Sequence, residues 1–194
     1  KTYESERRAH TFDLISWAVD IGVLMQQIAA RETCERLGEQ PPELQKSMRK
    51  TGYGQGREQP AIRSGAVMIE QVCDDGISGY LFSQPMVRDK TGNVFRFDEL
   101  IGSNFSLLSL GQVSLNDQSK RIIKAIDIKQ VDISLFEVVV GKFPDLLKLG
   151  GILLLRPDKV VFGHTSHSIS ADDLILKLKS SIKLKVPTAD TSLS

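Results

Sequence analysis

Residues 4–37 contain no proline, and this uninterrupted stretch constrains the fold more than any other feature of the chain. Apolar residues recur in it mostly at helical spacing: Phe12, Ile15, Trp17, Val19, Leu24 and Ile28. We therefore predict a helical segment over residues 1–37 that is one long helix or is kinked at Gly22. Because its middle is apolar on more than one face, this helix should pack against something larger than itself.

A connector over residues 38–65 is predicted next, because proline and glycine accumulate there among polar residues. We expect no regular secondary structure in the connector, apart from a turn of helix around residues 43–49. The glycines of residues 52–56 superficially match a phosphate-binding loop. That motif requires a preceding strand and a following Gly-Lys-Ser/Thr, and both are missing, so we interpret the stretch as a linker.

Residues 66–186 are predicted to form an α/β domain, followed by a tail over residues 187–194. Its expected elements are a hairpin around the turn 89–93, a central strand 105–110, a helix 117–126, a strand 135–140, a hairpin around the turn 156–159 and a terminal helix. Ser170 with Asp173 three residues later predicts the capping box of that last helix. This order favours a mixed sheet with flanking helices, and a thioredoxin-like fold satisfies it.

The charge balance excludes some classes of partner. The chain has 25 Lys and Arg residues against 24 Asp and Glu residues, which gives a formal net charge of +1. This gives no bulk electrostatic reason to expect binding to nucleic acid or to an anionic membrane. Small molecules and proteins remain as partners.

The chain begins without an initiator methionine and without the pattern of a signal peptide. We also expect no membrane contact, since no run approaches the roughly 20 apolar residues of a membrane span. The two cysteines, Cys34 and Cys73, are lone thiols, which are typical of a reducing compartment. These features predict a piece of a larger cytoplasmic protein.

Redox and metal chemistry are both disfavoured by the residue pattern. Thiol exchange normally uses Cys-x-x-Cys, which is missing, and a thiol oxidoreductase would need Cys34 and Cys73 within about 7 Å at their Cα atoms. His164 and His167 stand three residues apart, but their Gly, Ser and Thr neighbours make a poor helix, so we interpret them as part of a solvated loop. His10 is the remaining histidine.

A basic stripe near the end of the chain has a simple interpretation. It consists of Lys177, Lys179, Lys183 and Lys185, which alternate with leucine and isoleucine. We predict that these lysines form the solvated face of the last helix, where cations near the C-terminus are favourable.

Four segments resemble flavin monooxygenases in their residues and in their order along the chain: TYESERRAH at 2–10, GYLFSQPMV at 79–87, FDELIGSNF at 97–105 and LLLRPDKVVF at 153–162. The chain resembles the carboxy-terminal third of the FAD-dependent aromatic hydroxylases of the phenol hydroxylase type. The sequences SQPMV and IGSNF are most similar to those of the 3-(3-hydroxyphenyl)propionate hydroxylases.

The resemblance implies a parent enzyme in which NAD(P)H reduces FAD and the flavin then activates oxygen to hydroxylate a phenolic ring. It implies that residues 1–37, with Tyr3, Glu6, Arg7 and Arg8, follow the flavin domain and pack on it. The thioredoxin-like domain that follows would have lost its cysteines. Both flavin-binding motifs would lie before Lys1, so we predict no catalytic, cofactor-binding or metal-binding residue in this chain and no FAD bound by it.

The role expected for the chain is therefore structural, as an inactive part that supports the flavin domain or a homo-oligomer. Gln84 and Pro85 should shape the start of the first hairpin, while Arg156, Pro157 and Asp158 should form the last turn. A free-standing thioredoxin-like interaction domain without catalytic cysteines remains the alternative.

Overall fold

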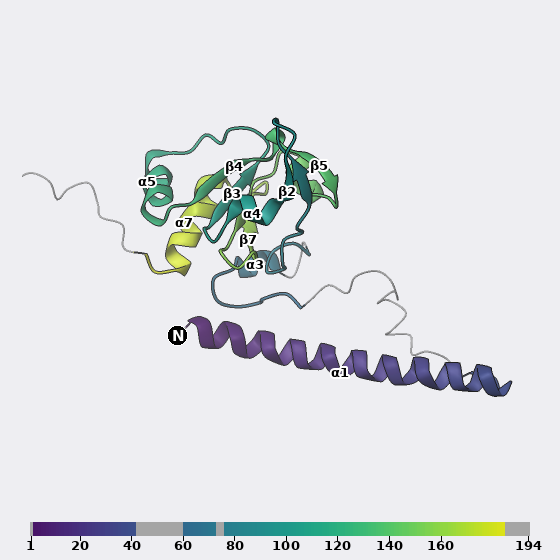
Figure 1. Ribbon diagram of the computed structural model, residues 1–194. Coiled ribbons are helices and arrows are strands. Elements are labelled where there is room, and N and C mark those ends of the chain that lie inside the picture. Colours follow the sequence, from purple (N-terminus) through teal and green to yellow (C-terminus); the bar gives the residue numbers. More distant parts are fainter. Residues whose placement is uncertain (1, 42–59, 73–75, 185–194) are drawn as a thin grey trace, which may run out of the picture. The chain divides into compact units, whose positions relative to one another are not determined.

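The computed structural model describes residues 2–41, 60–72 and 76–184, and it divides into two compact units, Tyr3–Pro60 and Ala61–Ser194 (Figure 1). Several sequence predictions fall outside the described residues. These are the helical turn at 43–49, the glycine-rich stretch 52–56, Cys73 with its acidic neighbours, Lys185 and the tail 187–194.

The first unit contains the helix α1 (Thr2–Leu37), whose 36 residues confirm the predicted long helix. Gly22 does not break it. Gly38 ends it with φ of 73°, a left-handed conformation that glycine adopts without steric cost. Large apolar side chains are exposed on more than one face, including Phe12 (71% exposed) and, on another face, Met25 (56% exposed). This agrees with the apolar pattern seen in the sequence.

One expectation about α1 needs correction. By length and composition alone, Glu6–Leu37 is a helix that could cross a membrane. The sequence argument counted unbroken apolar residues, whereas residues 14–30 carry a single charge, Asp20, and are apolar on average. The buried core helix of a soluble protein has the same length and composition, so this property assigns no location to α1.

The second unit contains the predicted helices and strands in their order, with an additional strand at residues 129–132. Its elements are α3 (Ile69–Val72), β1 (Met86–Arg88), β2 (Val94–Arg96), α4 (Phe97–Ile101), β3 (Ser106–Ser109), α5 (Asp117–Ile126), β4 (Lys129–Asp132), η1 (Ile133–Leu135), β5 (Glu137–Val140), α6 (Asp145–Lys148), β6 (Leu153–Leu155), β7 (Val161–His164) and α7 (Ala171–Ser181). The unit is therefore mixed α/β, with short strands between short helices.

The strands form two sheets rather than one. Four strands lie in the order β4-β3-β6-β7, with β3 and β4 parallel and the other neighbours antiparallel. The interior position of β3 confirms the predicted central strand. Three more strands form a second, antiparallel sheet in the order β2-β1-β5.

The predicted strand 135–140 is partly wrong. Asp132 ends β4 and accepts a hydrogen bond from the Ser134 backbone through its side chain, which starts the 3-10 turn η1. That turn redirects the chain, so the strand begins only at Glu137 and joins β1 in the second sheet. Residues 129–140 thus supply one strand to each sheet, β4 to the first and β5 to the second.

The four-stranded sheet is covered on both faces. In β3, Leu107 points to one hydrophobic cluster and its neighbour Leu108 to the other, as the alternation of a strand requires. In β6, Leu154 belongs to the first cluster while Leu153 and Leu155 belong to the second. All five side chains are at most 1% exposed, so this sheet is the centre of the fold.

Helices α5 and α7 cover the first face (Figure 1). Ile122 and Ile123 project from α5, and Leu174, Ile175 and Leu178 project from α7. Both helices have side-chain N-caps. Asn116 accepts from the Ser119 backbone, and Ser170 with Asp173 forms the predicted capping box.

The second face packs against α4, α6 and the second sheet through a cluster rich in phenylalanine. A smaller third cluster contains Ala61, Ile62, Val67 and Val160. The last residues of the predicted connector are thus buried on the second unit.

Candidate functional site

The carboxyl ends of β3 and β4 hold the clearest candidate site in the described part of the chain. In open α/β sheets, ligands bind outside the carboxyl ends of parallel strands, and β3 and β4 are the parallel pair described here. A pocket of about 330 Å³ lies at these ends. Its lining residues are Leu107, Ser109, Gly111, Gln112, Val113, Gln130, Val131 and Asp132.

Asp132 organises this pocket, which we call the β3–β4 pocket. Its Oδ1 atom accepts from the Gly111 backbone at 2.8 Å, from the Ser134 backbone at 2.9 Å and from the Ser134 hydroxyl at 2.6 Å. Hydrogen bonds to an ionised carboxylate favour its charged form. The Ser134 hydroxyl, followed by the two backbone donors, therefore lowers the pKa of Asp132 below its ordinary value of 3.8.

This lowered pKa predicts an acid-dependent loss of stability. A carboxylate whose pKa is depressed on folding stabilises the protein above its unfolded pKa and stops doing so as the pH falls through the lower folded value. The contribution of Asp132 should therefore be complete at neutral pH and should be lost below about pH 4. We expect Asp132→Asn to lose less stability than the wild type between about pH 7 and pH 3.

Urea unfolding midpoints at the two pH values measure this difference. Asp89, Asp145 and Asp173 also have a lowered pKa, so the variant should keep part of the acid dependence. Asp117→Asn is the matched control, because Asp117 is 86% exposed and is paired with the exposed Lys120. Equal acid losses in wild type and Asp132→Asn would contradict the prediction.

The sequence analysis did not single out Asp132, Gly111 or the two glutamines of the pocket. A signal was present, since polar residues follow two strands that a helix connects, and such strands are normally parallel neighbours. The broken strand 135–140 hid this signal because β4 was not recognised as a separate strand.

His164 is placed differently from the prediction. It is the last residue of β7 and is 9% exposed, so it does not belong to a solvated loop. Gln71 explains the burial: its side chain accepts from the His164 backbone N–H at 3.0 Å and donates to the His164 carbonyl at 2.8 Å. These two bonds complete the edge of β7 in place of another strand. His167 is exposed in the following turn.

The described residues contain no group of three or more His, Cys, Asp or Glu side chains that could hold a metal ion. Cys34 is half-buried in α1 and is not in a disulfide. Since Cys73 lies outside the described residues, the structure does not test whether the two thiols approach each other.

The turn residues lie where the sequence placed them. Arg156 binds the Asp158 carboxylate through two nitrogens, at 2.7 and 3.1 Å, and also donates to the Ala66 carbonyl. Its N–H and C=O close the β6–β7 turn with Val160 and Lys159. Pro85 accepts a hydrogen bond from the Phe97 backbone at the start of β1, and Gln84 is exposed beside it.

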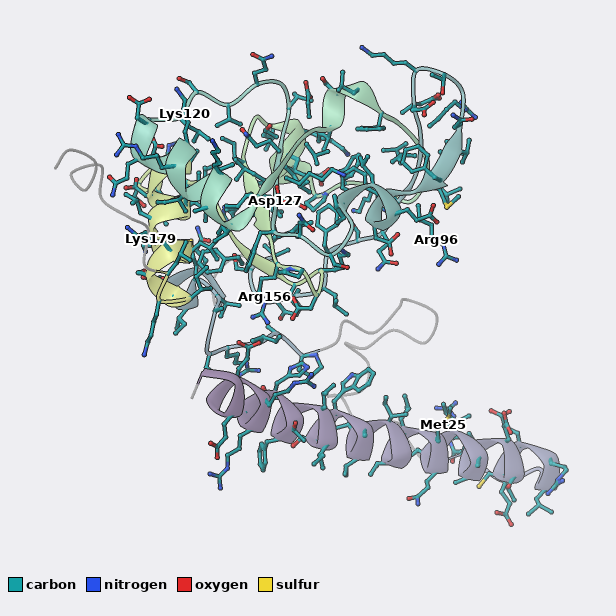
Figure 2. All side chains as sticks on the ribbon, turned by 60° about the vertical axis from the view of Figure 1, so that its left-hand side comes forward. Met25, Arg96, Lys120, Asp127, Arg156 and Lys179 are labelled. Atoms are coloured by element: carbon teal, nitrogen blue, oxygen red, sulfur yellow. The ribbon has the colours of Figure 1, made fainter. Side chains whose placement is uncertain are left out.

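The basic stripe is only partly a solvated face. Lys177 is held by Glu70 at 2.9 Å, Lys179 is half-exposed, and Lys183 follows the helix with φ of 54°. Figure 2 shows Lys120 and Lys179 on the side of the second unit that carries α5 and α7, with Arg96 on the opposite side.

The β3–α5 connection does not fit FAD. A flavin dinucleotide needs free backbone amides at a glycine-rich turn between a strand and a helix. At the β3–α5 connection, the Gly111 amide is already bound by the Asp132 carboxylate, whose charge would also repel a diphosphate. The N-terminus of α5 is capped by Asn116.

Comparison with known proteins identifies the relationship. No family model matches the chain. The crystal structure of a ternary complex of aklavinone-11 hydroxylase with FAD and aklavinone covers 94% of this chain, with a TM-score of 0.50 and 16% identity, and therefore shows a shared fold. The 3-(3-hydroxy-phenyl)propionate/3-hydroxycinnamic acid hydroxylase of Klebsiella pneumoniae (strain 342) is 27% identical over 115 residues. The chain is related to part of the FAD-dependent aromatic hydroxylases.

This relationship confirms the resemblance inferred from the four sequence segments. The coverage is partial, because the matched regions are 57% of this chain but 20% of the Klebsiella hydroxylase, and this chain spans 35% of aklavinone-11 hydroxylase. The relationship to the FAD-dependent aromatic hydroxylases therefore concerns a minor portion of each of those proteins.

Proposed function

We propose that this chain is the carboxy-terminal region of a flavin-dependent monooxygenase that hydroxylates a phenolic ring with NAD(P)H and O2. The observation that carries the proposal is the 27% identity to the Klebsiella hydroxylase over 115 residues. In such an enzyme the flavin supplies the oxygen chemistry. The present chain contributes structure, which is consistent with the poor fit of its β3–α5 connection to FAD.

The domain built on the four-stranded sheet is proposed to be thioredoxin-like. The order β4-β3-β6-β7 supports this, with the parallel pair β3–β4 connected by α5 and the hairpin β6–β7 followed by α7. Thiol chemistry at the loop after β3 has no support, because residues 110–116 contain no cysteine.

Helix α1 is proposed to pack on the flavin domain of the parent enzyme. Its exposed Phe12, Ile15 and Val19 are 58–71% exposed, and apolar side chains in such number favour burial against a partner surface. The location of the parent is proposed to be cytoplasmic, and a homo-oligomer is the proposed assembly, with the second unit as support.

The first test is to read the coding sequence upstream of Lys1 and then to express the full reading frame. We expect a strand followed by Gly-x-Gly-x-x-Gly upstream, and a full-length protein that carries bound FAD, detected by its visible absorbance. That protein should oxidise NAD(P)H when a phenolic acid is added. The chain starting at Lys1 should carry no flavin under the same conditions.

Two results would contradict the proposal. A start codon directly before Lys1 would indicate a free-standing thioredoxin-like interaction domain. Stoichiometric FAD on the chain starting at Lys1 would show that the flavin site lies within these residues. A full-length Asp117→Asn variant, changed at an exposed position of α5, is the control and should match the wild type in flavin content.

A further inference from the structure

The β3–β4 pocket has the features of a binding site that is independent of flavin chemistry. We propose that it binds a small organic cation, with the ammonium group at Asp132 and the alkyl part against Leu107 and Val113. The proposal does not depend on the proposed function, because it rests on the walls, the unused polar groups and the charge of the pocket.

The walls of the pocket are fixed before any ligand arrives. The Gly111 N–H is bound by Asp132 Oδ1, and the Gly111 carbonyl accepts from the Ser109 hydroxyl at 2.7 Å. The N–H and the carbonyl of Gly111, in the loop after β3, are therefore anchored to the ends of β4 and β3. Gly111 has φ of 88°, which is strained for residues with a side chain, so glycine lets the loop turn here. A preformed wall reduces the entropy lost on binding.

Several polar groups of the pocket are left without a protein partner. Within the described part of the chain, Asp132 Oδ2 and the side-chain amides of Gln112 and Gln130 make no hydrogen bond, although Asp132 Oδ1 makes three. Gln112 and Gln130 are exposed and Asp132 is half-buried, so all three side chains are accessible. A few polar groups beside apolar walls are the usual composition of a small-molecule site.

The charge of the pocket selects the class of ligand. Its lining contains one carboxylate and no lysine, arginine or histidine. Lys90 is near enough to influence the charge of Asp132 but does not line the pocket. An anionic ligand would be repelled by the ionised Asp132, whereas an ammonium group can donate to Oδ2 and to the glutamine carbonyls.

The size of the pocket sets the scale of the ligand. Its volume of about 330 Å³ corresponds to roughly ten water molecules at the density of the liquid. A short alkylammonium fits this volume, with the methylenes against Leu107 and Val113 and the charged end at Asp132.

The experiment titrates the whole chain with n-butylammonium and with butyrate, two probes of similar size and opposite charge. Amide shifts of Gly111 and Gln112 and the side-chain NH2 shift of Gln130 are followed by ¹H–¹⁵N NMR. We expect saturable shifts with butylammonium and an affinity at least about tenfold weaker for butyrate. Asp132→Asn should weaken butylammonium binding by about tenfold or more, since it removes the charge.

Two further variants keep the test interpretable. Gln130→Ala removes a side chain that makes no hydrogen bond to the described residues, so it should fold normally and weaken binding several-fold. Asp117→Asn removes an exposed carboxylate of α5 outside the pocket and should leave the affinity unchanged. Linear shifts without saturation, equal affinity for butyrate, or unchanged binding in both Asp132→Asn and Gln130→Ala would overturn the proposal.

Discussion

Replacing Gln71 with methionine is expected to destabilise the second unit by about 2–4 kcal/mol, because two buried backbone groups of His164 lose their partner. Gln71 is 8% exposed, and its amide both accepts from and donates to the His164 backbone. Methionine has a similar length and fills the same space, so the loss should come from the missing hydrogen bonds rather than from a cavity. Urea unfolding gives the free energy.

The adjacent residue supplies the control for this prediction. Glu70 lies in the same short helix but forms an exposed ion pair with Lys177, so Glu70→Ala should cost less than about 1 kcal/mol. Hydrogen exchange at the His164 amide gives a local test, since its protection should fall in Gln71→Met and persist in Glu70→Ala. Similar unfolding free energies for wild type and Gln71→Met would show that Gln71 does not hold the β7 edge.

Phe97→Ala is expected to cost about 3–5 kcal/mol, the largest effect of any change considered for this chain. The Phe97 side chain is 0% exposed, and its ring contacts Phe143 edge-on with 4.9 Å between centroids. Phe82 and Phe136 lie at 6.0 and 6.2 Å. Removing this ring deletes buried area and leaves a cavity among aromatic neighbours that can close only in part.

An exposed apolar residue of the same unit is the control. Leu149 is 85% exposed at the end of α6, so Leu149→Ala should change the unfolding free energy by less than about 0.5 kcal/mol. The loss of unfolding free energy in Phe97→Leu should lie between the losses in Leu149→Ala and Phe97→Ala. A loss below about 1 kcal/mol for Phe97→Ala would mean that the aromatic cluster is not the centre of the second core.

The elements with strong local signals were predicted correctly from the sequence. The capping box of Ser170 and Asp173, the turn at residues 156–159 and the helix Asp117–Ile126 each depend on residues close together in the chain. Local hydrogen bonds and helical periodicity are visible in a single sequence because they need no partner element.

The errors have a common physical cause, which is that they depend on distant partners. Sequence pattern could not tell that Gln71 would bind residue 164 across 93 positions of the chain, so His164 was taken for a loop residue. Likewise, β4 and β5 are separate strands because β5 pairs with β1 in the second sheet. Arg88 of β1 and Glu137 of β5 form an ion pair across these strands, although they are 49 positions apart in the chain. The β3–β4 pocket escaped notice for the same reason.

The two-sided burial of the four-stranded sheet has a consequence for how this domain can evolve. Leu107 and Leu108 are neighbours in sequence, yet the backbone of the sheet separates them into two clusters that share no side chains. A change of volume in one cluster can therefore be compensated by repacking on its own side, without adjustment on the other. The face under α5 and α7 and the aromatic face can thus diverge at different rates, and related chains could keep one face nearly intact while the other is rebuilt.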